Sequence, residues 1–183
     1  MPKPNTERRL WEAFSAESAA AMRYTLYAQA ARREGYQQIG DILEETASNE
    51  QAHARLWLMA LGALPNGDQP GDTLKNLRAA AQVEHKEWNE EYKQCAQTAQ
   101  QDGESALEKQ FEMVAAIEAS HEERFQALIK NLEEGAVFSK PQQPAAVWRC
   151  RFCGHLHAAS EACQVCPVCG HPQAFFELEA QNY

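Results

Sequence analysis

Apolar residues recur at steps of three and four in four stretches of the chain, which is the spacing of one face of an α-helix. In each stretch, acidic or imidazole side chains interrupt the apolar stripe. The four stripes are Leu10, Phe14, Glu17, Ala21, Tyr24 and Ala28; Leu43, Thr46, Glu50, His53, Trp57 and Ala60; Leu74, Leu77, Ala81, Glu84 and Trp88; and Leu107, Phe111, Val114, Glu118, His121, Phe125, Leu128 and Leu132. Burying an ionised carboxylate is costly unless an opposite charge compensates it. Four helices that turn carboxylates inward therefore predict a cation site, most simply a pair of metal ions.

Breaks in the helical pattern define the expected elements and domains. Glycine-containing segments near residues 35–40, 62–72 and 102–103 separate four helices between about residues 5 and 134. We predict a mainly α fold, with a four-helix bundle over residues 1–138, a polar linker at 139–146 and a small metal-knuckle domain over 147–183. A tail of that size cannot build an adequate apolar core, so a metal must hold it together.

An internal repeat relates the two halves of the predicted bundle. Glu17 and Glu50 lie 33 residues apart, Glu84 and Glu118 lie 34 residues apart, and each second Glu opens a Glu-x-x-His pair. In an antiparallel hairpin, groups at equal distances from the turn lie at the same height. The repeat therefore predicts that all these side chains converge on one level of the bundle.

The spacing of these side chains matches a di-iron site of a helical bundle. Such sites take one Glu from each of two helices and a Glu-x-x-His from each of the other two. An isolated Glu-x-x-His pair is usually a solvated surface pair, but two pairs on core stripes with repeat symmetry favour metal ligands. The predicted ligands are Glu17, Glu50, His53, Glu84, Glu87, Glu118 and His121. Mixed carboxylate and imidazole ligands suit iron or manganese.

Charge balance predicts that the site holds metal. Five carboxylates carry about five negative charges, while two ferrous ions, or two oxide-bridged ferric ions, carry about four positive charges. Glu87 is an extra carboxylate, so we expect Glu87 and His53 to alternate on one iron as its oxidation state changes. The simpler alternative for Glu87 is an exposed acid in the acidic helix HKEWNEEY.

Two Cys-x-x-Cys-Gly motifs lie in the tail, at Cys150 and Cys153 and at Cys166 and Cys169. Their four thiolates predict a tetrahedral site, and the glycines let backbone amides turn towards sulfur. Sulfur coordination alone favours a structural zinc ribbon over iron. The adjacent di-iron site reverses that preference, because a cycling metal pair needs electrons that an Fe(Cys)4 centre provides and zinc does not.

The remaining cysteines, histidines and aromatic residues are expected to have packing or surface roles. We expect Cys95 to fill the core of its helix, and Cys163 to be a free thiol. His85 is expected to be solvated, and His155, His157 and His171 to lie at the surface or behind the thiolates. The aromatic residues expected to pack the small core are Trp148, Phe152, Phe175 and Phe176.

Bulk composition excludes several classes of function. The formal net charge of -9 argues against a nucleic-acid surface, and no polybasic membrane patch is present. The sequence has no apolar run of membrane-spanning length and no signal-peptide core at its start. The paired cysteine spacing also does not indicate secretion. We therefore expect a soluble cytoplasmic protein.

In combination, these motifs resemble rubrerythrin over essentially the whole chain. The matching pattern is Glu17, Glu50-x-x-His53, Glu84-x-x-Glu87 and Glu118-x-x-His121, followed by CRFCG and CPVCGHPQAFFEL. The resemblance implies a ferritin-like di-iron bundle with a rubredoxin-like domain. It further implies that Glu50 and Glu118 bridge the irons, that Glu17 and Glu84 are terminal ligands and that His121 is a fixed ligand. Tyr24 and Tyr92 match family tyrosines that donate hydrogen bonds near the irons.

The resemblance also implies an activity in oxidative-stress protection. The expected enzyme is a non-haem peroxidase that reduces hydrogen peroxide to water, with an oxo- or hydroxo-bridged di-iron centre when oxidised. Electrons are expected to pass through the Fe(Cys)4 centre from a separate reductase or a rubredoxin. One rival is a ferroxidase that oxidises ferrous ions with oxygen and handles iron. Another is a scaffold whose tail is a zinc ribbon that docks a partner.

The family further implies a head-to-tail homodimer. The segment between the second and third helices, residues 62–72, spans at most about 36–40 Å when extended. A crossover along a helix of about 23 residues must cover about 35 Å. So taut a connection favours a domain-swapped dimer, in which the first two helices pair with the last two of another chain. The alternative is the ordinary crossover within one chain.

Overall fold

The computed structural model describes residues 3–63, 72–143 and 145–180, and the chain forms two compact units, residues 1–76 and 77–183. Most of the secondary-structure elements are helices, and a small sheet lies near the C-terminal end of the sequence. This confirms the predicted fold class. The expected crossover falls largely on residues 64–71, which lie outside the described residues. No helix in the described part of the chain is long and apolar enough to cross a membrane.

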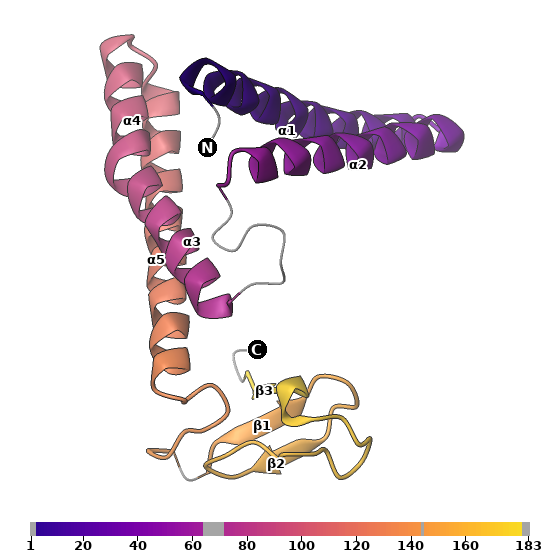
Figure 1. Ribbon diagram of the computed structural model, residues 1–183, viewed down its shortest axis with the longest axis vertical. Coiled ribbons are helices and arrows are strands. Elements are labelled where there is room, and N and C mark those ends of the chain that lie inside the picture. Colours follow the sequence, from indigo (N-terminus) through magenta and orange to yellow (C-terminus); the bar gives the residue numbers. More distant parts are fainter. Residues whose placement is uncertain (1–2, 64–71, 144, 181–183) are drawn as a thin grey trace. The chain divides into compact units, whose positions relative to one another are not determined.

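The first unit is built on a helical hairpin of α1 (Pro4–Arg33) and α2 (Gln37–Ala60), which run side by side in Figure 1. Gly35, with φ of +93°, occupies the left-handed region that favours glycine and lets the chain reverse within three residues. The buried side chains between the helices are mainly alanines: Ala21, Ala28, Ala31, Ala47 and Ala54. Small side chains allow the two backbones to approach closely, which brings polar groups on the two helices within reach of each other.

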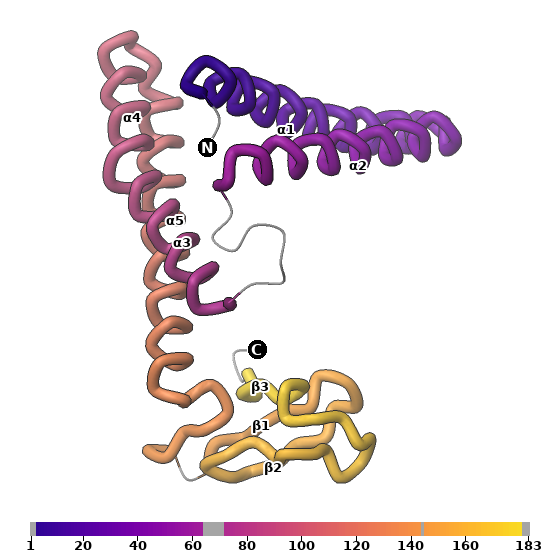
Figure 2. Tube along the Cα trace, in the orientation of Figure 1, coloured from indigo at the N-terminus to yellow at the C-terminus, as the bar shows by residue number. Residues whose placement is uncertain are grey.

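The second unit begins within α3 (Thr73–Lys86) and continues with a π-helical turn η1 (Glu87–Glu91), α4 (Tyr92–Gln101) and α5 (Ser105–Glu133). The first three form one continuous helical rod that reverses near Gly103 into α5, as Figure 2 shows. The ion pair between Arg78 and Glu133, 2.6 Å from Nη2 to Oε1, joins the two ends of this hairpin. The sequence pattern predicted the third helix without the π-turn.

The tail forms a three-stranded antiparallel sheet in the order β2-β1-β3, from β1 (Val147–Cys150), β2 (Leu156–Ala158) and β3 (Phe176–Leu178), with a 3-10 turn η2 (Gln173–Phe175) before β3. Its core consists of six buried residues, two of which are cysteines of the predicted metal knuckles: Ala146, Trp148, Cys150, Ala162, Cys166 and Phe176. Phe138 packs against this core, and Ser139 pairs with Glu161 in an isolated bridge. The segment expected as a linker thus makes contacts with the small domain.

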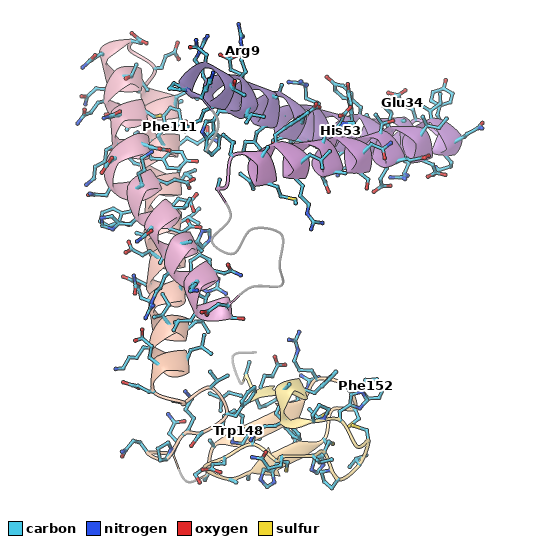
Figure 3. The ribbon with its side chains drawn as sticks, in the orientation of Figure 1. Arg9, Glu34, His53, Phe111, Trp148 and Phe152 are labelled. Atoms are coloured by element: carbon cyan, nitrogen blue, oxygen red, sulfur yellow. The ribbon has the colours of Figure 1, made fainter. Side chains whose placement is uncertain are left out.

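Two expectations about packing are wrong, one in the tail and one in the second hairpin. Neither Phe152 nor Phe175 packs in the small core, since 63% and 38% of their surfaces are exposed. Figure 3 shows Phe152 at the edge of the domain while Trp148 lies within it. Cys95 is exposed instead of filling the core of its helix, and the neighbouring Ala96 is buried. The π-turn explains the second error, because it adds a residue before position 95 and rotates the rest of the helix.

We predict that close approach of α1 and α2 depends on the alanines between them. Ala47 is 2% exposed, so Ala47→Leu should overpack the hairpin and lower the free energy of unfolding by about 1–3 kcal/mol in urea titrations followed by circular dichroism. The matched control is Ala52→Leu on the exposed face of α2, which should change the stability little. Equal effects of the two substitutions would contradict close packing at Ala47.

Candidate metal centres

The first hairpin brings together three of the predicted ligands, Glu17 from α1 and Glu50 and His53 from α2. One ligand atom from each lies within 4.8 Å of those of the other two. His53 Nδ1 is 2.9 Å from Glu50 Oε2, and Figure 3 shows His53 on α2. Hydrogen bonds from His53 and Glu17 hold the pKa of the Glu50 carboxyl below its usual value, although burial opposes them. The hairpin therefore holds an ionised carboxylate beside a second acid and an imidazole.

The second hairpin repeats this arrangement with Glu84, Glu118 and His121. Their ligand atoms again lie within 4.8 Å of one another. His121 Nδ1 is 2.7 Å from Glu118 Oε2 and 3.4 Å from Glu84 Oε2. The two carboxylates are only 18% and 15% exposed, which makes their charges expensive to hold together without a cation.

Glu87 and Tyr92 lie next to this second group. Burial raises the pKa of the Glu87 carboxyl, and the nearby charges of Glu84 and Glu118 raise it further. Burial likewise raises the pKa of the Tyr92 hydroxyl, with Glu87 and Glu118 adding to the effect. Both groups therefore tend to keep their protons at the edge of the ligand group. On α1, Tyr24 lies two turns after Glu17, with its ring centroid 6.3 Å from that of Tyr27.

The acidic and imidazole side chains of the two hairpins are chemically suited to bind a metal ion. Glu84 Oε2 is buried and accepts no hydrogen bond from the described residues, which leaves a charged oxygen lacking a donor. A cation at this position would satisfy that oxygen and reduce the repulsion between Glu84 and Glu118. The donor set of carboxylates with one imidazole in each hairpin suits iron or manganese, as the repeat in the sequence predicted.

The cysteine site assembles from two knuckles with the same backbone hydrogen bonds. Gly154 N–H donates to the Cys150 carbonyl at 2.8 Å, and Gly170 N–H donates to the Cys166 carbonyl at 2.9 Å. Both glycines have positive φ, 76° and 74°, a conformation that favours glycine after each second cysteine. The four sulfurs form one group, with Cys150 and Cys169 at 3.8 Å and Cys153 and Cys166 at 3.6 Å.

Backbone amides point at these sulfurs. Burial tends to raise the pKa of the Cys166 thiol, but the N–H groups of Cys169 and Val168 donate to its sulfur and lower the pKa to about 7. The backbone N–H of His155 donates to Cys153 and that of His171 to Cys169, but burial and the neighbouring thiols outweigh these bonds, so the pKa of Cys153 is raised and that of Cys169 is raised to about 12. Crowding of the four thiols thus opposes their ionisation in the absence of a cation. Four sulfurs this close fit one tetrahedral metal.

Sequence reasoning missed one cluster beside the second ligand group. Trp88 Nε1–H donates to Glu122 Oε2 at 2.6 Å, and His85 Nδ1 lies 3.0 Å from the same oxygen. His85 is exposed, as expected, but its contact with Glu122 was not anticipated, and Trp88 was expected to be a simple core residue. A signal was present, because His85 directly follows the ligand Glu84, and Glu122 directly follows the ligand His121.

Comparisons with known proteins agree with this geometry. The family model described as Rubrerythrin matches residues 9–129, and the model described as the rubredoxin-like domain of rubrerythrin matches residues 148–177. Rubrerythrin-1 of Clostridium acetobutylicum is 41% identical, with 97% of this chain and 96% of that protein covered. A rubrerythrin of Porphyromonas gingivalis is 40% identical, with 97% and 92% covered. A rubrerythrin of Nitratidesulfovibrio vulgaris is 39% identical, with 97% and 96% covered.

We predict that Cys166 is a metal ligand and that Cys163, only three residues earlier, is not. Cys166→Ser should remove one metal ion per chain, measured by elemental analysis, and should expose Trp148, measured as a red shift of tryptophan fluorescence. Cys163→Ser serves as the matched control and should leave both properties unchanged. Loss of one metal from the Cys163 variant, or full metal content in the Cys166 variant, would contradict this ligand set.

Proposed function

The chain belongs to the rubrerythrin family, and on that basis we propose that it is an oxidoreductase that reduces hydrogen peroxide to water with a di-iron centre. The observation that carries this proposal is the presence, in one chain, of two carboxylate and imidazole groups and a four-cysteine site. A protein that only stores iron needs no tethered one-electron donor. The four-cysteine site therefore favours the peroxidase over a ferroxidase.

The proposed ligands are divided between the hairpins and the tail. One hairpin supplies Glu17, Glu50 and His53, and the other supplies Glu84, Glu118 and His121, with Glu87 adjacent. The tail holds its metal through Cys150, Cys153, Cys166 and Cys169. When bound, the iron pair supplies two electrons to the peroxide bond and the Fe(Cys)4 iron supplies their replacements, which is chemistry that zinc in the tail would not support.

Reduction of one peroxide to two waters consumes two protons as well as two electrons. Glu87 and Tyr92 are suited to hold protons there, because burial and neighbouring carboxylates raise the pKa of both groups. A carboxyl whose protonated form is favoured can donate to a departing oxygen. We assign proton delivery to Glu87, and hydrogen bonding to bound peroxide to Tyr92 and Tyr24.

Glu87 is also suited to exchange with His53 as a metal ligand. It lies outside the 4.8 Å group formed by Glu84, Glu118 and His121 but within electrostatic reach of it. His53 is the more exposed of the two histidines, with half of its side chain accessible. An uncharged Glu87 leaves a ferrous site undisturbed, and an ionised Glu87 adds the hard oxygen donor that ferric iron prefers.

The electron donor is proposed to contact the tail near its thiolates. Phe152 and Val168 directly precede Cys153 and Cys169, and they are 63% and 67% exposed. Exposed apolar side chains beside a redox centre allow a reductase or a rubredoxin to exclude water there. Arg151, next to Phe152, lies 3.5 Å from the Glu177 carboxylate, so its charge is balanced and the proposed contact relies on the apolar side chains.

We propose that each complete di-iron site forms in a homodimer, from the first hairpin of one chain and the second hairpin of the other. Each hairpin by itself carries only half of the ligand set, so the site requires one hairpin of each kind. The short segment 62–72 supports an exchange between chains, because an intrachain crossover would need almost its full extended length.

Rapid mixing tests the proposed activity. The anaerobically reduced protein should be oxidised by hydrogen peroxide at least about tenfold faster than by oxygen at equal concentration, followed by iron absorbance. Glu87→Gln should slow the peroxide reaction by about 100-fold or more, the range for loss of a proton donor, whereas the exposed Glu90→Gln should not. Faster oxidation by oxygen than by peroxide would instead favour the ferroxidase.

A mixed dimer tests the proposed assembly. Two differently tagged chains, one with Glu17→Ala and one with Glu84→Ala, are co-expressed and the mixed dimer is isolated. In an exchanged dimer both substitutions fall in one site, which leaves the other site intact and about half of the wild-type activity. In an unexchanged dimer each site carries one substitution. Activity of the mixed dimer no greater than that of either variant alone would rule out the exchange.

A further inference from the structure

The cluster of His85, Trp88 and Glu122 occupies a flank of the second hairpin, beside the ligand stripe. Glu122 Oε2 is shared by the indole N–H of Trp88 at 2.6 Å and by His85 Nδ1 at 3.0 Å. The rings of His85 and Trp88 meet edge to face with centroids 5.2 Å apart. Only 20% of the Glu122 side chain is exposed. Glu122 therefore differs from the solvated acids on the same helix in both its burial and its hydrogen-bond partners.

This cluster spans the π-turn that carries Glu87. His85 lies just before η1, Glu87 is its first residue and Trp88 its second. A π-turn takes in one more residue than an α-turn, and such insertions in helices commonly occur at functional sites. The extra residue changes which side chains after it face inward, as buried Ala96 and exposed Cys95 show. The inward position of Tyr92 therefore depends on this turn, and Glu87 is the residue at which the turn begins.

Apolar contacts between α5 and the π-turn are few, so they stabilise the turn only weakly. Opposite Trp88, α5 presents Ala116 and Ala119, and these residues line a cavity of about 440 Å³. Small side chains beside a cavity give few dispersion contacts to fix the backbone. A hydrogen bond to a charged carboxylate is stronger than one between neutral groups, so the Trp88–Glu122 contact is the stronger restraint.

Glu122 is also rigidly connected to the ligand group. It follows His121 directly and lies one helical turn after Glu118, so its position moves with both ligands. Its Oε2 accepts a hydrogen bond from Trp88 Nε1–H on the π-turn, and most of its side chain is shielded from solvent. Glu122 thus ties the π-turn to the ligand-bearing turn of α5.

We propose that Glu122 is a positioning residue, which holds the π-turn through Trp88 and His85 so that Glu87 stays beside the metal ligands. The inference rests on the proposed metal site but not on the identity of the oxidant. Its consequence is that disturbing the flank, without touching any ligand, changes metal binding, and does so only through Glu87.

We call the contact of Glu122 with Trp88 and His85 the clamp. The test uses two clamp variants together with matched controls. Trp88→Phe keeps the ring and removes the indole N–H, and Glu122→Gln keeps the shape and removes the charge. The controls are Trp11→Phe in the other hairpin and Glu123→Gln on the exposed side of α5. In the full-length protein, amide hydrogen exchange across 87–92 should quicken roughly tenfold in both clamp variants and not in the controls, since each loses a charged hydrogen bond.

Cobalt(II) titration of the full-length chain after metal removal supplies the decisive measurement. Each clamp variant should bind cobalt at the helical site about tenfold more weakly than the unsubstituted chain, with changed visible absorption. In a Glu87→Ala background the same clamp substitutions should cause no further loss. If the clamp variants weaken cobalt binding equally with and without Glu87, their role is structural and the proposal is wrong. Unchanged exchange and cobalt affinity in both variants would also overturn it.

If the protein proved to be a ferroxidase, these readouts would be unaffected, because neither uses peroxide. Failure of the proposed function and failure of the clamp are therefore separable. A variant that did not fold would be recognised from its helical circular dichroism, and the other clamp variant would then carry the test.

Discussion

Electrostatic repulsion among closely placed acids is the constraint on which the rest of this structure depends. Each helical hairpin holds two carboxylates with one imidazole, and their ligand atoms lie within 4.8 Å of one another. Two like charges at that distance repel by roughly 4 kcal/mol when the effective dielectric constant is about 20. The buried oxygen of Glu84 accepts no hydrogen bond from the described residues that would offset this cost. A cation bound in each hairpin would remove the repulsion and satisfy the oxygen, which is why we propose that both hairpins contribute to a metal site.

The same constraint organises the packing around the ligands. Alanines between α1 and α2 bring Glu17 close to Glu50, and Glu87, at the start of the π-turn, lies within electrostatic reach of Glu84 and Glu118. In the tail, the buried positions of Cys150 and Cys166 make the metal ligands part of the core itself. We therefore expect folding and metal binding to be coupled in both parts of the chain, although through different ligands.

The regular features of the fold and site followed from the sequence, because they depend on local periodicity. Steps of three and four predicted the helices, and the recurring Glu-x-x-His placed His53 and His121 beside their carboxylates. The irregular features could not be predicted from the sequence. One inserted residue in a helix leaves no mark on a binary pattern, so the π-turn and the exposure of Cys95 were missed. The contact of Trp88 with Glu122 joins residues far apart in the chain, and only the packing of the hairpin brings them together.

Iron content combined with Mössbauer spectroscopy, on protein purified without oxygen, tests the central claim most directly. We predict three irons per chain, two with oxygen and nitrogen ligands that couple magnetically after oxidation, and one with the spectrum of tetrahedral sulfur coordination. A chain that keeps its helical fold yet takes up no iron outside the cysteine site would contradict the claim that cations hold these acids together.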